Sequence, residues 1–159
     1  MGLGRILVRS LGPVRGPWRE AARQYLERLE GRLPLHWEEK PELRSDPRLG
    51  ERDEDRVRRL EAERLTQGLP QDADLWACDA LGEEMDSLAF ARMVAGWQQA
   101  STAQVLVIGG HLGLDRELRR RARLLSLSRL TFSHQMVPAL LFEQIYRAIS
   151  ILDGTPYHR

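Results

Sequence analysis

The sequence predicts one α/β domain in which a parallel-containing sheet is flanked by helices on both faces. Segments that read as buried strands alternate along the chain with segments whose apolar residues recur at helical spacing. The chain has 159 residues, which matches a single domain of ordinary size. Hydrophobic residues make up 42% and charged residues 30%, a balance typical of a globular protein and not of a disordered one. We therefore expect residues 1–159 to form one domain.

The first half of the chain predicts two strands, two helices and a flexible loop. In order, they are a strand at 5–11, a helix from Pro17 to about 33 with Trp18 on its buried side, a strand within 33–39, a loop at 41–54 and an amphipathic helix from 56 to Gly68. Pro17 suits the first turn of a helix, and Gly68 suits the position after the last turn. The loop at 41–54 is rich in proline, glycine and charge, which predicts an exposed segment.

The second half predicts three further strands and three further helices. They are a strand at 73–82, a helix at 86–100 with Leu88 on its buried side, a strand at 104–108, a helix at 115–125, a short strand near 127–132 and a long helix from Pro138 to Leu152. The strand at 104–108 has the strongest signal, because it is almost continuously apolar and rich in β-branched residues. Asp86 or Ser87 is the expected N-cap of the helix after the third strand.

A glycine-rich turn follows the strand at 104–108. The stretch "VLVIGGHLGLD" takes a buried strand into Gly109 and Gly110 and then toward a helix, an arrangement typical of nucleotide-like ligand sites at the carboxyl edge of a parallel sheet. It is neither a G-x-G-x-x-G fingerprint nor a phosphate loop. A tight turn without a ligand is the other interpretation.

Positive charge is concentrated in the last third of the chain. Residues 101–159 hold 8 Lys/Arg against 4 Asp/Glu, whereas residues 1–100 hold 16 against 19, so the net charge of +1 divides into +4 and −3. Arg116, Arg119, Arg120 and Arg123 share roughly one face of the helix expected at 115–125. Contact with RNA phosphates is one interpretation, and an ordinary solvated surface is the other.

The last helix and the chain end are unusual. Apolar residues lie on nearly every side of residues 138–152, which predicts burial on more than one side and hence a subunit interface as well as core packing. Glu143, Arg147 and Ser150 form one polar line along it. The chain then ends in "PYHR", although chain ends usually fray unless something holds them.

Other classes of protein and site are not indicated. No apolar run approaches the length that spans a bilayer, and the first residues lack the apolar core and cleavage site of a signal peptide, so the expected location is the cytoplasm. Cys78 is the single cysteine and the four histidines lack metal-ligand spacing, so we expect no metal site.

Several motifs in the last third occur together in one family. They are "VIGGHLGL" at 107–114, "LSLSRLTFSHQM" at 125–136, "EQIYRA" at 143–148 and the terminal "YHR", with weaker similarity across the rest of the chain, including "RRLEAERL" and "ACDALG". In this order and spacing the chain resembles the RlmH family of SPOUT methyltransferases. These are small bacterial enzymes that methylate N3 of a pseudouridine in large-subunit ribosomal RNA.

The resemblance implies a fold, a cofactor and partners. The fold is the SPOUT α/β fold with a C-terminal trefoil knot, here at about 105–159, and two subunits pair through the last helix as a homodimer. S-adenosyl-L-methionine binds in the knot, and the substrate is 23S ribosomal RNA in the assembled ribosome. In that setting the terminal tail crosses to the partner subunit and closes a composite active site.

The family's motif positions transfer to this chain residue by residue. The implied cofactor contacts, mostly through backbone groups, are Cys78, Gly109, Gly110, Leu127, Ser128, Arg129, Leu130, Thr131 and Phe132. The implied catalytic set is Arg147, Tyr157, His158, Arg159, His134 and Glu143. Within that set we expect Tyr157 and His158 to position the base, and Arg147 and Arg159 to stabilise negative charge on ring or phosphate.

This chain also departs from the family pattern, and other functions remain open. Glu83 stands where a lysine is usual, His111 where a small residue or proline is usual, and Cys78 where leucine is common. One alternative is a non-catalytic protein of the same fold that binds RNA or the ribosome. The other is an unknotted flavodoxin-like nucleotide-binding enzyme, which the missing phosphate-loop residues disfavour.

Overall fold

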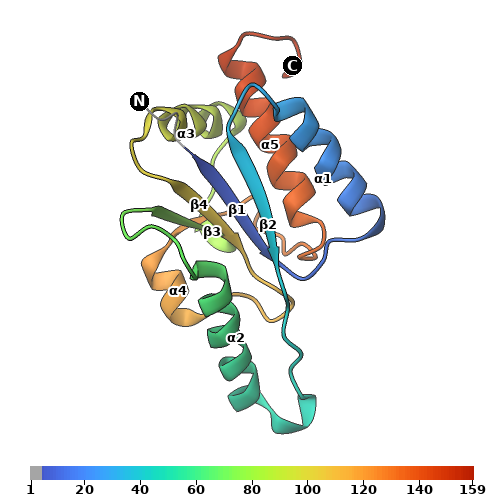
Figure 1. The fold of residues 1–159 in the computed structure, drawn as a ribbon. Coiled ribbons are helices and arrows are strands. Elements are labelled where there is room, and N and C mark those ends of the chain that lie inside the picture. The colour runs from blue at the N-terminus through green and yellow to red at the C-terminus, as the bar shows by residue number, and fades with distance from the viewer. Residues whose placement is uncertain (1–4) are drawn as a thin grey trace.

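The computed structural model describes residues 5–159 and contains one five-stranded parallel sheet (Figure 1). The strands are β1 (Ile6–Leu11), β2 (Leu35–Lys40), β3 (Asp74–Glu83), β4 (Gln104–Ile108) and β5 (Arg123–Leu125). Their order across the sheet is β2-β1-β4-β3-β5, and every neighbouring pair is parallel. All five residues of β4 are buried, because this strand lies in the middle of the sheet and is covered on both faces. The predicted α/β class is confirmed.

Five α-helices cover the two faces of the sheet (Figure 1). Helices α1 (Gly16–Leu29), α3 (Ser87–Gln99) and α5 (Val137–Leu152) share one hydrophobic core with one face, and α2 (Glu51–Thr66) and α4 (Arg116–Arg121) share a second core with the other. The alternation along β4 feeds both cores, since Leu106 and Ile108 join the first and Val105 and Val107 the second.

The helices begin where the sequence provides the required groups. Pro17 lies in the first turn of α1. The Asp86 carboxylate accepts a 2.7 Å hydrogen bond from the Ala89 backbone N–H at the start of α3, as predicted. Asp115 caps α4 by accepting from the backbone N–H groups of Glu117 and Leu118. Each cap satisfies donors that the helix itself leaves without a partner.

The predicted loop at 41–54 is too long. A 3₁₀ turn occupies Pro47–Leu49 and α2 already begins at Glu51. Three acidic residues in the first turn favour this earlier start, because they lie at the positive end of the helix dipole. One of them, Asp53, accepts a 2.8 Å hydrogen bond from the Asp46 backbone N–H and so ties the preceding segment to the helix.

The short strand predicted near 127–132 is wrong, since the strand lies earlier, at Arg123–Leu125. In the residues that follow β5, serine side chains take the place of sheet hydrogen bonds. The Ser126 hydroxyl donates to the Ser128 carbonyl (2.8 Å), and the Ser128 hydroxyl accepts from the Leu130 N–H (3.1 Å). Residues 126–136 are therefore irregular. Arg123 consequently leaves the predicted arginine face and lies over the Trp76 ring, 4.2 Å from its centroid.

The pairing of β3 with β5 contains an irregularity. Leu125 pairs with both Cys78 and Glu83, so the residues between them bow away from β5 and return. Gly82 lies directly against β5, where an added Cβ would be 2.6 Å from the Leu124 carbonyl carbon. Only glycine permits this close approach of two backbones.

Two large side chains predicted to be buried are exposed. Trp18 of α1 is 39% exposed and Leu88 of α3 is 51% exposed. Helical periodicity places a residue on a face but cannot tell how far the neighbouring elements extend over that face. Among the helices within residues 5–159, none combines the length and apolar character needed to cross a membrane.

Candidate functional site

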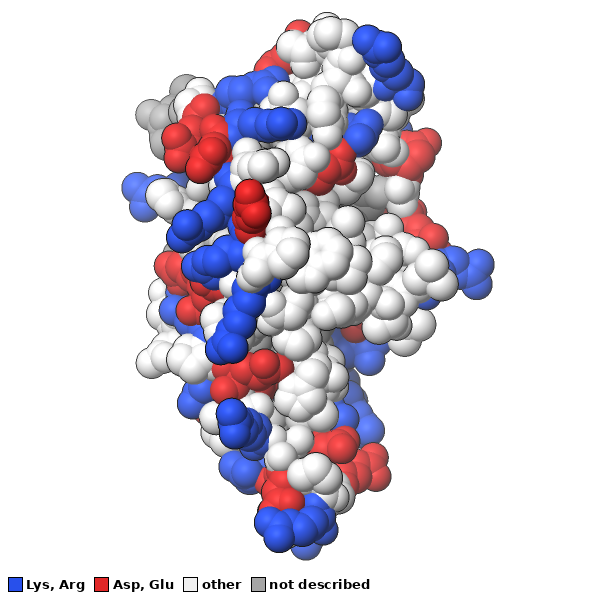
Figure 2. All heavy atoms as spheres, turned by 90° about the vertical axis from the view of Figure 1, so that its right-hand side faces the viewer, with Lys and Arg blue, Asp and Glu red and all other residues white. Residues whose placement is uncertain are grey.

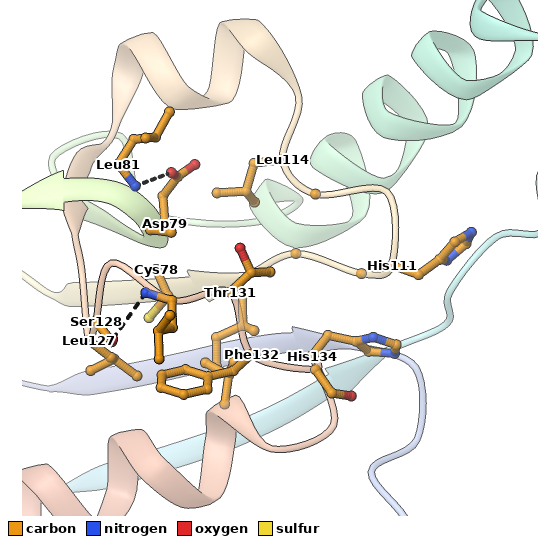
Figure 3. Close-up of a pocket in the computed structure, with 18 of the residues that line it drawn as sticks. Cys78, Asp79, Leu81, His111, Leu114, Leu127, Ser128, Thr131, Phe132 and His134 are labelled. Atoms are coloured by element: carbon orange, nitrogen blue, oxygen red, sulfur yellow. Dashed lines mark hydrogen bonds between the residues drawn. The ribbon is translucent and has the colours of Figure 1, made fainter.

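A cavity of about 650 Å³ opens at the carboxyl ends of β3 and β4 (Figure 3). Three segments enclose it: residues 78–81 after the paired part of β3, the turn at 108–114 after β4, and the irregular segment at 127–134. Parallel strands place their carboxyl ends at one edge of a sheet, which is where open α/β folds bind ligands. The start of α5 closes one side through Val137.

All nine residues that the resemblance assigns to cofactor contact line this single cavity. They are Cys78, Gly109, Gly110, Leu127, Ser128, Arg129, Leu130, Thr131 and Phe132. They come from three segments far apart in the sequence, which the parallel sheet brings together. The lining combines apolar side chains with backbone groups of irregular segments, which suits a ligand having both an apolar body and polar groups.

The glycine turn at 109–113 is compact and anchored from outside. The Gly113 N–H donates to the Gly110 carbonyl (3.0 Å), and Gly113 has a φ of +77° that favours glycine. An added Cβ at Gly109 would lie 3.1 Å from both the Gly113 carbonyl carbon and Leu114 Cδ2. The Arg58 guanidinium of α2 donates to the Leu112 carbonyl at 2.9 Å. The turn is therefore held in one shape before any ligand arrives.

Sequence reasoning missed an ion pair on the cavity wall. The Asp79 carboxylate lies 3.0 Å from the Arg119 guanidinium and accepts from the Leu81 backbone N–H at 2.8 Å. Both Asp79 and Arg119 line the cavity. The pair joins β3 to α4. Asp79 lies within "ACDALG" and Arg119 on the predicted arginine face, but nothing in the sequence pairs the two, and only their spatial proximity does. No group of three or more His, Cys, Asp or Glu side chains suited to holding a metal occurs in the described part of the chain, residues 5–159.

The Cys78 thiol faces this cavity, and its surroundings disfavour the thiolate form. Burial, together with the neighbouring Asp79 charge, raises the pKa of Cys78 to about 12. The thiol is therefore uncharged at neutral pH, and an uncharged thiol is a poor nucleophile. This position serves packing and does not suit nucleophilic catalysis.

We expect alkylation of Cys78 by iodoacetamide at pH 7.5 to be at least about 100-fold slower in the folded chain than in the urea-unfolded chain. The raised pKa lowers the fraction of thiolate, which is the form that reacts. Mass spectrometry of timed, quenched samples measures both rates. Comparable rates in the two states would contradict the uncharged thiol.

A second cluster lies along α5 and contains four of the six predicted catalytic residues. The Arg147 guanidinium donates to Glu143 Oε1 (2.6 Å) and lies 3.3 Å from His158 Nδ1, and the Tyr157 hydroxyl donates to Glu143 Oε1 (3.0 Å). The Tyr157 ring also packs edge-on against Tyr146, with centroids 4.8 Å apart. The chain end is therefore held on its own helix.

The charges in this cluster are mutually stabilised. Hydrogen bonding and charge from Glu143 raise the pKa of Arg147. Burial, followed by hydrogen bonds with Tyr25 and Glu143, raises the pKa of Tyr157 well above its ordinary value. Tyr157 is thus a neutral hydrogen-bonding group at physiological pH and not a source of phenolate. Tyr25 of α1, whose hydroxyl is 3.3 Å from that of Tyr157, was not foreseen in this role.

The cavity and the tail cluster do not meet within one chain. The chain end lies beside the C-terminal part of α5, whereas the cavity adjoins the start of that helix (Figure 1). Of the six predicted catalytic residues, His134 alone lines the cavity. Glu143, Arg147, Tyr157 and His158 form the tail cluster, and Arg159 is exposed at the chain end.

Comparison with known proteins gives matches over nearly the whole chain. A family model described as "Predicted SPOUT methyltransferase" matches residues 5–158. The protein named ribosomal RNA large subunit methyltransferase H from Rhodopseudomonas palustris (strain BisB18) is 40% identical over 158 residues, covering 98% of this chain and 99% of that protein. Its namesake from Pelobacter propionicus is 42% identical over 156 residues, covering 97% and 99%. The one from Ralstonia pickettii (strain 12J) is 39% identical over 158 residues, covering 98% and 99%.

Proposed function

The chain belongs to the SPOUT methyltransferase family and is a ribosomal RNA methyltransferase, and we propose that it methylates N3 of a pseudouridine in 23S ribosomal RNA of the assembled ribosome. The observation that carries the proposal is the gathering of all nine implied cofactor residues around one cavity. We also propose that residues 1–159 act as one cytoplasmic domain whose segment at about 105–159 forms a trefoil knot. Membership of this family replaces the flavodoxin-like alternative.

The cavity suits S-adenosyl-L-methionine. Its volume of about 650 Å³ falls in the range that holds a ligand of this size. At Gly109 and Gly110 the cavity is lined by backbone, with no side chain on these residues to cover it. Residues 127–132 supply backbone groups and the Phe132 ring for a heteroaromatic group. When bound, the cofactor supplies a methyl group already activated on a sulfonium.

The chemistry at the target base sets what the protein's own residues must do. N3 of a uracil-type ring is protonated at neutral pH and must lose its proton before it can accept a methyl group. The enzyme therefore has to align the ring, accept a proton and stabilise developing negative charge. In this proposal Tyr157 and His158 position the ring, and Arg147 and Arg159 provide the positive charge. Their separation from the cavity means that a second copy of the chain must bring them to it.

The side of the molecule formed by α1 and α5 suits that second copy. Figure 2 shows this side with a broad uncharged area bordered by a line of Lys and Arg. Trp18 on α1 is 39% exposed and Leu152 at the end of α5 is 41% exposed, while Leu140 and Ile151 are half-buried. Exposed large apolar residues bordered by charge are typical of protein interfaces. We propose a homodimer that pairs through this side.

We expect light scattering at micromolar concentration to give about twice the chain mass of 18.3 kDa. Replacing Trp18 with Glu places a charge at an exposed apolar position of α1 and should shift the protein toward monomer. Arg48→Glu, which changes an exposed residue outside α1 and α5, should leave the mass unchanged. A wild-type protein that stays monomeric at these concentrations would contradict both the interface and the shared site.

The proposed activity is tested by transfer of labelled methyl groups. Ribosomes that lack the modification, isolated large subunits and free 23S ribosomal RNA are each incubated with the protein and S-adenosyl-L-[methyl-³H]methionine. Label should enter one pseudouridine, with whole ribosomes as the preferred substrate. RNA binding without label incorporation and without saturable cofactor binding would favour the non-catalytic RNA-binding alternative.

A further inference from the structure

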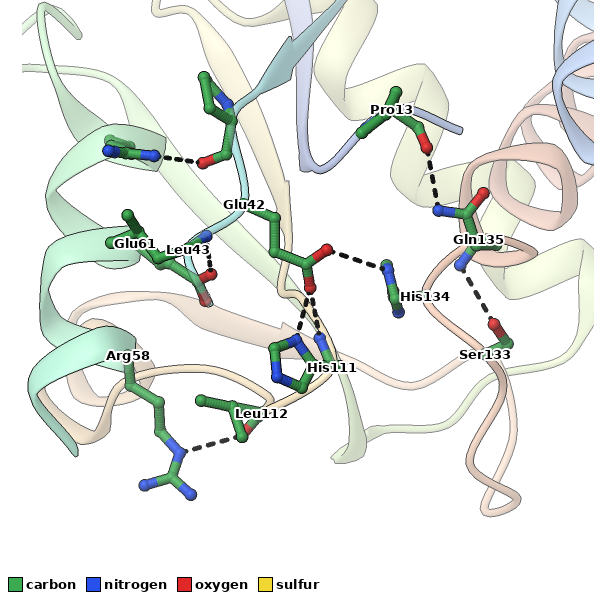
Figure 4. Close-up of polar contacts among 12 residues, drawn as sticks. Pro13, Glu42, Leu43, Arg58, Glu61, His111, Leu112, Ser133, His134 and Gln135 are labelled. Carbon is green, nitrogen blue, oxygen red and sulfur yellow. Dashed lines mark hydrogen bonds and ion pairs between the residues drawn. The ribbon is translucent and has the colours of Figure 1, made fainter. Parts of the chain in front are cut away.

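The Glu42 carboxylate lies between two histidines at the mouth of the cavity (Figure 4). Its Oε1 accepts a hydrogen bond from the His111 backbone N–H (3.1 Å) and lies 2.7 Å from His111 Nδ1. Its Oε2 lies 3.6 Å from His134 Nε2. Both histidines line the cavity, and Glu42 comes from the segment between β2 and α2. Glu42 therefore influences the cavity through these two side chains.

Two glycines leave the space that the Glu42 carboxylate occupies. An added Cβ at Gly110 would lie 2.6 Å from Glu42 Oε1, and one at Gly12 would lie 3.1 Å from Oε2. Side chains at these two positions would displace the carboxylate. The residues on either side are anchored to α2, because the Leu43 N–H donates to Glu61 (2.9 Å) and the Arg64 guanidinium donates to the Pro41 carbonyl (2.7 Å). Glu42 is thus fixed in both backbone and side chain.

The backbone around His134 is also held. The Gln135 amide donates to the Pro13 carbonyl (3.0 Å) and accepts from the Arg15 backbone N–H (2.9 Å). These contacts join the segment before α5 to the segment before α1. With the backbone fixed in this way, the remaining freedom of His134 is the rotation and protonation of its ring, and the ring faces Glu42 (Figure 4).

The charge state of Glu42 bears on both histidine rings. Burial raises the pKa of Glu42, but hydrogen bonds from the His111 side chain and backbone, with the charges of both histidines, outweigh it and leave the pKa below its ordinary value. An ionised carboxylate can only accept hydrogen bonds. His111 Nδ1, which lies 2.7 Å from Oε1, is placed to donate to it, and His134 Nε2 presents the same kind of edge to Oε2 at 3.6 Å. The one polar contact of the His134 ring among residues 5–159 is at Nε2, so in the tautomer that carries its proton there the Nδ1 lone pair has no partner in the described chain.

We propose that Glu42 is a positioning residue that fixes the orientation and tautomer of His134, and that His134 Nδ1 accepts the N3 proton of the target base. The inference rests on the proposed methyl-transfer function. In this step the N3–H bond breaks, its electron pair stays on N3, and the proton forms a bond with the Nδ1 lone pair. The Glu42 carboxylate stabilises the imidazolium that results, as a carboxylate does beside a histidine base in other enzymes.

Glu42→Gln is a sharp test because the amide can fit in only one orientation. The His111 backbone N–H needs an acceptor, so the amide oxygen takes the place of Oε1. The amide nitrogen then faces His134 Nε2 and requires an acceptor there, which moves the ring proton to Nδ1. The substitution keeps the shape of the side chain but removes the lone pair that the reaction needs. Glu42→Asp keeps the negative charge on a side chain that is one methylene shorter.

Nuclear magnetic resonance of ¹⁵N-histidine-labelled protein reads the tautomer directly, without any methyl transfer. Wild-type His134, assigned with a His134→Asn sample, should carry its proton on Nε2, and Glu42→Gln should move it to Nδ1. An Nδ1-protonated His134 in the wild type overturns the proposal even if no variant folds. An unchanged tautomer in a folded Glu42→Gln protein overturns the coupling between the two residues.

Kinetics on unmodified ribosomes give the second readout. We expect Glu42→Gln to lower kcat by about 10- to 100-fold, the lower part of the range for general-base catalysis, with less than about twofold change in the KM for S-adenosyl-L-methionine. Glu42→Asp should recover part of the loss. The matched control is Glu38→Gln, which changes a paired carboxylate on β2 bound to Arg9 and should keep wild-type kcat.

The two proposals fail in different ways. Wild-type kcat in Glu42→Gln, or a loss matched by Glu38→Gln, overturns the positioning role. Absence of methyl transfer by the wild type overturns the proposed function, whereas the tautomer measurement still decides whether Glu42 controls His134.

Discussion

Replacing both His158 and Arg159 with alanine is expected to reduce methyl transfer to ribosomes by about 100-fold, the scale seen when a positioning or charge-stabilising group is removed. Stability should change by no more than about 0.5 kcal/mol, because Arg159 is exposed and His158 has only a 3.3 Å contact with Arg147. Tyr157 is kept, since its ring packs on Tyr146 and its loss would disturb α5. Cofactor affinity should be nearly unchanged.

The measurements are single-turnover methyl transfer, thermal unfolding and titration calorimetry with the cofactor. Arg32→Ala is the control, because it removes an arginine at the same end of α5, where Arg32 pairs with Asp153. It should lose far less activity than the tail variant. A tail variant with wild-type transfer rates would show that the tail has no part in the reaction.

Mixing two inactive chains shows which subunit the tail serves. The tail variant keeps an intact cavity, and a Gly109→Val chain keeps an intact tail. After subunit exchange each heterodimer holds one complete site if the tail acts across the interface, so part of the activity should return. No recovery, with exchange verified by native mass spectrometry, would mean that each tail serves its own chain.

Gly109→Val is expected to weaken S-adenosyl-L-methionine binding by at least about tenfold, or ~1.4 kcal/mol. A Cβ at this position already lies 3.1 Å from the Gly113 carbonyl carbon and from Leu114, and the two further methyl groups of valine must displace the turn or enter the cavity. The glycine turn forms part of the cavity wall. A displaced turn and a side chain that enters the cavity therefore both reduce the space for the ligand.

Gly96→Val is the matched control, because a Cβ at Gly96 on α3 meets no atom within 4 Å. It should bind the cofactor as the wild type does. Circular dichroism and thermal unfolding confirm that both variants fold, and titration calorimetry measures affinity. Unchanged affinity in a folded Gly109→Val protein would place the cofactor elsewhere.

The sequence predicted those parts of the fold whose signal is local. The continuous apolar run of β4, the cap at Asp86 and the apolar α5 each reflect physical preferences within a few residues. The segment at 127–132 shows where this fails. It was predicted as a strand, but residues 123–125 already occupy the edge of β3, and serine side chains supply hydrogen bonds in the segment that follows.

Less of the candidate site could be predicted from local sequence patterns. Its cavity residues were named from a family resemblance, because many of them line the cavity in irregular segments that leave no periodic pattern. The pairing of Glu42 with His111 joins residues 69 positions apart and leaves no trace in spacing or hydropathy. The tail was recognised as unusual, but no sequence pattern connected it with Tyr25 and Tyr146, which contact Tyr157.

Because β5 is short, the adjoining wall of the cavity can open locally. This strand has three residues at the edge of the sheet, and the cavity-lining segment at 127–132 follows it directly. Edge elements with few hydrogen bonds detach at a free-energy cost below that of global unfolding. At Gly82 the backbones of β3 and β5 lie directly against each other, because glycine has no side chain to keep them apart. A ligand that contacts both this segment and the glycine turn binds only when β5 is in place. Binding therefore stabilises the closed state, and any change that loosens β5 weakens the affinity for the ligand.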